Sequence, residues 1–180
     1  GVSLVNVRGF CPSVTGSLVE LWQPGGSYDF PASGALLFVS SSDAGDTSAG
    51  AGARTVLLQG LGTDFSRYVE IVALNGTTPV ASTGTFMRMN HVIVSGSGAH
   101  GSNRGTINVR HNATLLLSQI ASGSGHDDNA IYTVPEGHYA VIRSVNAFTG
   151  FDAIVRTRAA FRPGGSGSAW QNMFDLELHQ

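Results

Sequence analysis

The 180-residue chain contains no lysine, and all ten of its basic residues are arginines. Charged residues make up only 12% of it, about half the share usual in globular proteins. The net charge of −2 and the pI near 6.3 provide no strong positive field for a polyanion. We therefore expect no direct contact with nucleic acid. Arginine is planar and weakly hydrated, which suits it to protein interfaces.

Cysteine and long apolar runs are also scarce. Cys11 is the single cysteine, which excludes an intrachain disulfide and a zinc site built from several cysteines. No apolar run approaches the roughly 20 residues that a membrane-spanning helix needs, so no membrane partner is expected. The apolar spacing of an amphipathic helix is not sustained anywhere.

Short runs of alternating β-branched and aromatic residues take the place of helical patterns, and Gly, Ser, Thr and Asn lie between them. This composition is typical of short strands joined by tight turns. The runs span residues 4–8, 18–22, 35–40, 54–59, 67–74, 85–95, 105–110, 114–121, 130–134, 139–147, 153–161 and 173–178. They predict an all-β fold, an antiparallel, jelly-roll-like β-sandwich. We expect one domain over residues 1–180, with 1–17 and 164–180 as extending arms whose terminal strands can be exchanged.

Turn residues and loops support this interpretation. Turns are expected at Asn75-Gly76, at 135–137 and at 163–165, and long Gly/Ser/Ala-rich loops at 41–53, 96–104 and 122–128. Within 85–95, Phe86, Met89 and Val92 can share one face only if a bulge resets the alternation, which predicts an irregularity near His91.

The chain carries none of the local motifs of a nucleophile elbow, a zinc protease, a phosphate-binding loop or an EF-hand. We therefore predict no enzyme activity, no catalytic residues and no cofactor. The weak metal candidates are Asp127 and Asp128, beside His126 and Asn129, because adjacent oxygen donors can hold calcium. Asp43 with Asp46 comes second. Their spacing matches no calcium loop, so we interpret these residues as turn formers and predict no metal.

An enzyme of the sandwich type stays an alternative, since two carboxylates converging in a cleft could cleave glycans. Its candidates, Glu20, Glu70, Glu136 and Glu177, lie far apart in the sequence. The interface candidates are concentrated near the C-terminus, where a basic stretch precedes an apolar strand. They are Arg156, Arg158, Arg162, Trp170, Phe174, Leu176 and Leu178.

Several segments resemble one known class of protein. The stretch 41–56, with sequence SSDAGDTSAGAGARTV, continues through Gly60-Leu61 and 70–80, EIVALNGTTPV, and a later stretch is 131–140, IYTVPEGHYA. Together they resemble a segment recurrent in virion proteins of tailed bacteriophages, notably marine phages. The likeness covers roughly residues 36–145 and includes no catalytic residue.

The resemblance implies a virion structural protein, for which head decoration (cement) proteins with sandwich or jelly-roll folds are the nearest precedent. It implies the major capsid protein or other virion proteins as partners, and a virion location after assembly in the host cytoplasm. A homotrimer is the expected oligomer. The alternative is a neck, tail or fibre component with a connecting or receptor- or glycan-binding role.

Overall fold

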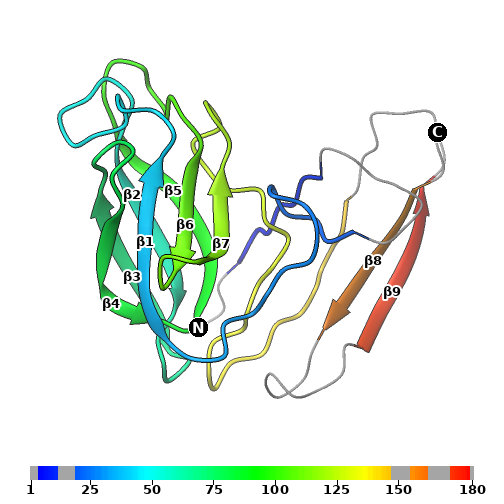
Figure 1. Cartoon of the computed structure of the whole chain (residues 1–180). Helices are drawn as coiled ribbons and strands as arrows, with labels where there is room; N and C mark the ends of the chain where they lie inside the picture. Colours follow the sequence, from blue (N-terminus) through cyan, green and yellow to red (C-terminus); the bar gives the residue numbers. More distant parts are fainter. Residues whose placement is uncertain (1–3, 12–18, 147–154, 162–170, 179–180) are drawn as a thin grey trace. The chain divides into compact units, whose positions relative to one another are not determined.

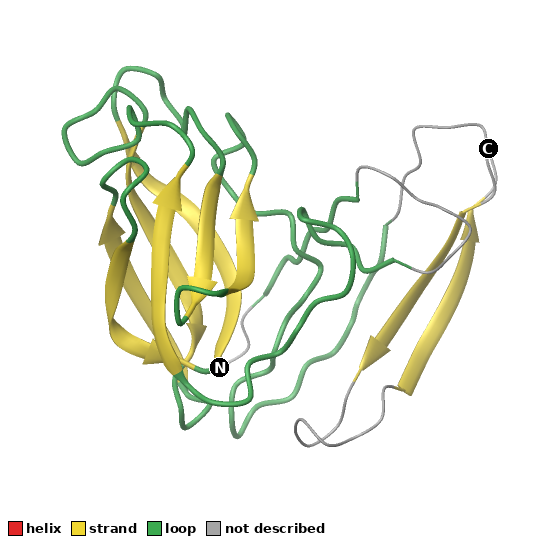
Figure 2. Ribbon diagram, in the orientation of Figure 1, coloured by secondary structure: helices red, strands yellow, loops and turns green. Residues whose placement is uncertain are grey.

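The computed structural model describes residues 4–11, 19–146, 155–161 and 171–178. Contacts between residues divide the chain into two compact units, Gly1–His138 and Tyr139–Gln180. Figure 2 shows strands and loops and no helix in the described part. The prediction of a single domain stays a prediction.

The first sheet of unit 1 has four strands in the order β4-β1-β6-β7. They are β1 (Ala35–Ser41), β4 (Val80–Phe86), β6 (Ile107–His111) and β7 (Leu115–Ile120). All neighbours run antiparallel. The hairpin between β6 and β7 turns at Asn112 and Ala113, whose φ angles of 49° and 62° are the left-handed pair of a type I′ turn.

The second sheet has three antiparallel strands in the order β3-β2-β5. They are β2 (Ala53–Leu61), β3 (Arg67–Ala73) and β5 (Arg88–Ser97). Figure 1 shows the two sheets as the two layers of a sandwich, so the all-β, antiparallel sandwich predicted from the alternation is confirmed. Alternate side chains from both layers form the core. The fully buried ones include Leu37, Val39, Val56, Leu58, Phe86, Val92, Ile107, Val109, Leu117 and Ile120.

The predicted irregularity near His91 is present as a β-bulge. On β2, Gln59 pairs with His91 and Gly60 pairs with Met89, so Asn90 is the extra residue on β5. Asn90 thereby resets the alternation, and Met89 and Val92 are both buried. At the same place a Cβ on Gly60 would lie 2.2 Å from the carbonyl oxygen of Arg88, so the bulge is tight enough to require glycine.

The side of the sandwich between β3 and β4 is closed by a side chain. The Glu70 carboxylate accepts hydrogen bonds from the backbone N–H groups of Thr83 (2.7 Å) and Gly84 (3.1 Å). It satisfies backbone donors of β4, the edge strand of its sheet. Tyr68 packs edge-on against Phe86, with ring centroids 4.9 Å apart, and its ring lies where a Cβ on Gly84 would be.

Aromatic side chains of the segment before β1 extend the core. Tyr28 packs edge-on against Trp22 and Phe30, at centroid distances of 5.1 and 4.8 Å. The buried Arg88 guanidinium lies over the rings of Phe30 and Phe65 and donates to the Pro31 carbonyl at 2.7 Å. Burial raises the pKa of the Tyr28 hydroxyl far above its usual value, although the nearby Arg88 charge opposes the shift.

Four predicted strands are wrong in the described part of the chain: residues 4–8, 19–22, 130–134 and 139–146 are irregular. At 130–134 the reason is visible, because the Asn90 side chain donates to the Thr133 carbonyl at 2.9 Å and accepts from its N–H at 2.8 Å. A side-chain amide thus takes the place of a neighbouring strand. Conversely, most of β4 was not predicted, because the Ser-Thr-Gly sequence in its middle resembles a turn.

Unit 2 contains a two-stranded antiparallel ribbon of β8 (Val155–Phe161) and β9 (Gln171–Leu178). The register pairs Arg156 with Glu177 and Arg158 with Asp175. It also places three of the apolar interface candidates opposite uncharged residues of β8, as Phe174 with Ala159, Leu176 with Thr157 and Leu178 with Val155. The other two interface candidates, Arg162 and Trp170, lie outside the described residues.

Candidate docking groove

The outer surface of the three-stranded sheet carries apolar side chains in register. Because successive side chains alternate between faces, the residues of β2 that point away from the core include Leu57 and Gln59. Leu57 pairs with Ile71 on β3 and Ile93 on β5, and Gln59 pairs with Val69 and His91. Ile71 and Val69 are 62% and 52% exposed. We call Leu57, Val69, Ile71 and Ile93 the outer apolar face.

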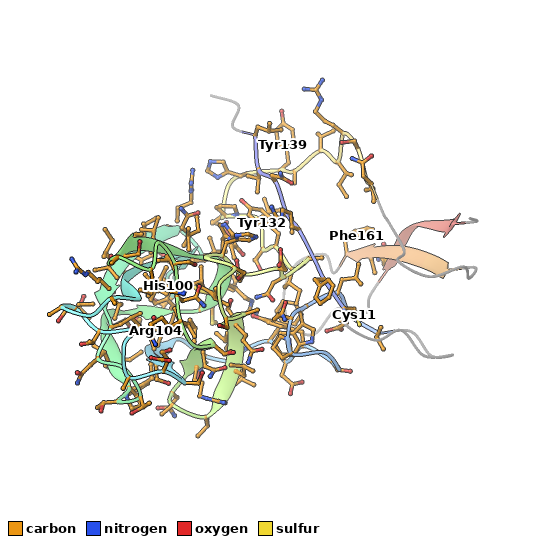
Figure 3. The ribbon with its side chains drawn as sticks, turned by 90° about the horizontal axis from the view of Figure 1, so that it is seen from above. Cys11, His100, Arg104, Tyr132, Tyr139 and Phe161 are labelled. Carbon is orange, nitrogen blue, oxygen red and sulfur yellow. The ribbon has the colours of Figure 1, made fainter. Side chains whose placement is uncertain are left out.

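A groove of about 470 Å³ lies over part of this surface. Its floor includes Gln59, Val69 and Ile93, and one of its sides is made by residues 4–8. The remaining lining comes from further residues of β2, β3 and β5, including Arg67 and His91, and from residues 126–135, among them Tyr132, which Figure 3 labels. The groove therefore combines a sheet surface with an extended segment from the N-terminal end of the chain.

The N-terminal segment is held at Arg8, Gly9 and Phe10, which we call the anchor. The Arg8 guanidinium hydrogen-bonds His126 and lies 3.2 Å from the Asp128 carboxylate, and the Phe10 N–H donates to the Asp128 carbonyl at 3.2 Å. A Cβ on Gly9 would lie 2.5 Å from the Cβ of Ala130, so the chain approaches too closely for any other residue.

Residues 4–7, which we call the N-terminal arm, differ from the anchor. Leu4 is 87% exposed, and Val5 and Val7 are 48% and 41% exposed. The arm lines the groove, yet neither its valines nor Val69 on the floor is covered. Arm and sheet therefore lie close together without burying their apolar side chains against each other.

Asp127 organises the polar end of the groove. Its buried carboxylate accepts hydrogen bonds from Ser118 Oγ (2.7 Å), Asn129 Nδ2 (3.1 Å) and the Val92 N–H (3.1 Å), and it is hydrogen-bonded to His91 Nδ1. These contacts fasten residues 126–129 to the edge of β5, where Asp127 N–H also donates to the Val92 carbonyl at 3.0 Å.

Serine, histidine and aspartate meet here, but not in the order that activates a serine. In a hydrolase triad the imidazole lies between the hydroxyl and the carboxylate and removes the hydroxyl proton. Here the carboxylate of Asp127 lies in the middle, and Ser118 Oγ donates to it while accepting from Asn129 Nδ2 at 3.0 Å. Ser118 is fully buried, so this arrangement is one of structural hydrogen bonds.

The weak metal candidates are both engaged by protein groups. Asp127 has its two oxygens occupied as described, and Asp128 faces Arg8 and His126. Among the residues that the structure describes, no group of three or more His, Cys, Asp or Glu side chains is arranged to hold a metal ion. The described residues also contain no helix long and apolar enough to cross a bilayer.

Asp46, named with Asp43 as a second metal candidate, is a structural centre at the other end of the sandwich. It is fully buried and accepts from the N–H groups of Ala53 (2.8 Å), Arg104 (2.8 Å) and Gly105 (2.9 Å) and from Ser41 Oγ (2.6 Å). Burial by itself would raise its pKa, but these four hydrogen bonds outweigh burial and hold the pKa below its ordinary value.

Asp43 and Arg104 are neighbours of this centre. The Asp43 carboxylate lies 3.5 Å from Arg104 Nε and accepts from the Gly45 N–H at 2.7 Å. Figure 3 labels Arg104 and His100, which lie in the loop between β5 and β6. The hydrogen bond from the Arg104 N–H to Asp46 connects this loop to the loop after β1. Sequence reasoning placed Asp46 in a loop correctly but gave no sign of its burial.

The groove itself was not predicted from the sequence. The run 67–73 alternates, but both of its phases contain apolar residues, so the sequence does not say which phase faces outward. The structure turns Val69 and Ile71 outward and Glu70 toward β4. Arg67, in the same phase as Val69 and Ile71, is a local signal for the exposed face, but Glu70 in the other phase cancels it.

Comparisons of the chain with protein-family models, curated proteins and solved structures gave no match.

Proposed function

We propose that the chain is a non-enzymatic virion structural protein, a capsid decoration or cement protein that stabilises the head lattice by binding across capsid subunits. The observation that carries the proposal is the clustering of exposed apolar side chains on extended segments outside the strands. In unit 2, Tyr139 is 89% and Val141 72% exposed, with Ile142 and Val145 nearby. In unit 1 the N-terminal arm is similar.

Single exposed apolar residues are normal on soluble proteins, whereas runs of them mark interaction sites. Residues 139–145 contribute four large apolar side chains within seven residues, in a segment without strand pairing. An extended segment of this kind can bury its side chains along a neighbouring subunit and pair its free backbone groups there. Rigid sheets with extended apolar segments suit a protein that joins subunits.

The ribbon of unit 2 supports the same role. A two-stranded ribbon is marginally stable by itself in water, and within the described residues β8 and β9 pair only with each other. The proposal includes a jelly-roll-like relationship of the sandwich, a homotrimer, and the major capsid protein as the principal partner. It rests also on the sequence resemblance to tailed-phage virion proteins.

The decisive measurement is the copy number of the chain in purified particles, by mass spectrometry with isotope-labelled peptides. A decoration protein follows the symmetry of the head lattice, so on the order of hundreds of copies are expected, in a fixed ratio to the capsid protein. About a dozen copies or fewer would refute decoration and favour the neck, tail or fibre.

A second measurement tests residues 139–145 directly. Val141→Lys, at a largely exposed position, leaves folding unchanged and should weaken binding to particles that lack the chain, because a charge enters the proposed apolar interface. The matched control is Ala81→Lys, an exposed alanine of β4 in the four-stranded sheet. Equal binding of both variants and the unsubstituted chain would contradict the role of this segment.

A further inference from the structure

We propose that the outer apolar face of each chain binds the N-terminal arm of a second copy. The inference deepens the proposed assembly role, on which it rests, by naming one partner and one surface. The two complementary parts are the arm at residues 4–7 and the outer apolar face formed by Leu57, Val69, Ile71 and Ile93.

The dimensions of the two parts agree. Four extended residues span about 13 Å at roughly 3.3 Å each, and three strands spaced about 4.8 Å apart are about 10 Å wide. On the arm, Val5 and Val7 are two residues apart and share a side of an extended chain. On β3, Val69 and Ile71 have the same spacing of about 6.6 Å. The valines of an arm can therefore contact both side chains of the face.

Charge also agrees. The arm, Leu-Val-Asn-Val, has no charged residue, and the face with its neighbour Gln59 has none. Three charged residues line the groove: Arg8 pairs with Asp128 at the anchor, the Asp127 carboxylate is buried and hydrogen-bonded, and Arg67 is exposed at the start of β3. The uncharged arm is thus matched to the four uncharged side chains of the outer apolar face, and Arg67 lies beyond Val69 at the start of β3. A charged peptide would find no partner among those four side chains.

A second copy is favoured by what the arm leaves uncovered in its own chain. The anchor holds Gly9 against Ala130 and fixes where the arm begins. From there residues 4–7 line the groove, but Val5, Val7 and Val69 stay 48%, 41% and 52% exposed. Every copy carries both parts, so each can give its arm to one neighbour and receive the arm of another. Such head-to-tail exchange forms a closed ring, such as a trimer, when the rotation between neighbours is about 120°.

Disulfide trapping between separate chains tests the contact. In a Cys11→Ser background, Val5→Cys in one preparation is mixed with Val69→Cys in another and oxidised. We expect a mixed disulfide dimer, seen by intact mass, at several times the yield of the control pair Val5→Cys with Thr83→Cys. Thr83 is exposed on β4, in the other sheet.

Two results would overturn the inference. One is a yield no greater than that of the control pair. The other is a double variant, Val5→Cys with Val69→Cys in one chain, that closes only within the chain at every protein concentration. Either would show that the arm serves its own chain.

Sedimentation of the purified chain gives a second readout. Val5→Asp and Val69→Lys, both at exposed positions, should each convert the oligomer to monomer without changing the unfolding midpoint, and the double variant should associate again through the new ion pair. A monomeric unsubstituted chain, or association indifferent to both substitutions, would overturn the inference. These assays contain no particles, so they are independent of the copy number. If they fail and the copy number is high, the arm contact is wrong and the decoration role remains. If they succeed and the copy number is low, only the decoration role is wrong.

Discussion

Replacing Asp46 with asparagine should destabilise the protein strongly, although the two side chains have nearly the same shape. The carboxylate is fully buried and accepts four hydrogen bonds, two on each oxygen. An amide nitrogen in the Oδ1 position would face the N–H groups of Ala53 and Arg104. In the Oδ2 position it would face the Gly105 N–H, while the Ser41 hydroxyl could turn and accept.

The amide will adopt the less costly orientation, with its nitrogen in the Oδ2 position, which leaves only the Gly105 N–H without an acceptor. This orientation sets the expected loss of stability. One buried backbone donor without a partner costs about 1–3 kcal/mol, and the remaining bonds lose the extra strength that a charged acceptor gives. We expect Asp46→Asn to lower the free energy of unfolding by about 2–4 kcal/mol, a large part of the roughly 5–15 kcal/mol available to a domain. Urea unfolding followed by tryptophan fluorescence measures the loss as a lower midpoint at unchanged slope.

The effect should also depend on pH. Because the folded-state pKa of Asp46 is lowered, the ionised carboxylate contributes stability that is fully present above the unfolded pKa, near 3.9. That contribution is lost as the pH falls through the folded pKa. The difference between the unsubstituted protein and Asp46→Asn should therefore be largest at neutral pH and shrink below about pH 4.

Asp64→Asn is the control. Asp64 also has a lowered pKa, mainly because the Ser66 hydroxyl donates to it, but it is exposed. Water can replace the lost bond, so its midpoint should stay close to that of the unsubstituted protein. The stabilising role of the buried Asp46 carboxylate is refuted if Asp46→Asn unfolds at the same urea concentration as Asp64→Asn, or if its loss of stability is the same at pH 3 and pH 7.

Three further substitutions test the local geometry, each by thermal and urea unfolding. Ala113→Gly should stabilise by about 0.5–1 kcal/mol, because Ala113 has a φ of 62° in the β6–β7 turn; a lower midpoint would contradict the strained turn. Gly60→Ala should destabilise by about 1–3 kcal/mol, since its Cβ would lie 2.2 Å from the Arg88 carbonyl oxygen, and an unchanged midpoint would show that the bulge relaxes freely. His111→Leu should stabilise by about 1 kcal/mol, because the buried Nε2 has no hydrogen-bond partner among the residues that the structure describes; destabilisation would mean that the imidazole is satisfied in solution.

Local patterns in the sequence determined the fold class. Alternating runs located β1, β2, β3, β5, β6, β7, β8 and β9 to within a few residues, because a strand with one buried face leaves a period of two in its own residues. The bulge at Asn90 was predictable for the same reason, since the buried pair Met89 and Val92 breaks that period. The predicted run 85–95 was wrong in one respect, because Phe86 ends β4 in the other sheet and β5 begins at Arg88. These are properties that neighbouring residues decide among themselves.

Tertiary structure decided everything that depends on partners distant in the chain. Residues 4–8 and 130–134 alternate like strands but have no strand beside them, and Asn90 provides a side-chain partner to Thr133 instead. Nothing local distinguishes the turn residues Asp46 and Asp127 from other aspartates, yet each becomes a buried centre because donors 58 residues away, at Arg104, or 35 away, at Val92, converge on it.

The groove belongs to this second group. Val69 and Ile71 become an exposed surface only because Glu70 is needed on the opposite side to close the sandwich against β4. The sequence by itself therefore determined that the chain folds into β-strands and where most of them lie. Which face of β3 is exposed, and which segment lies beside it, was decided by the tertiary structure, because burial and hydrogen-bond pairing are settled between strands and not within them.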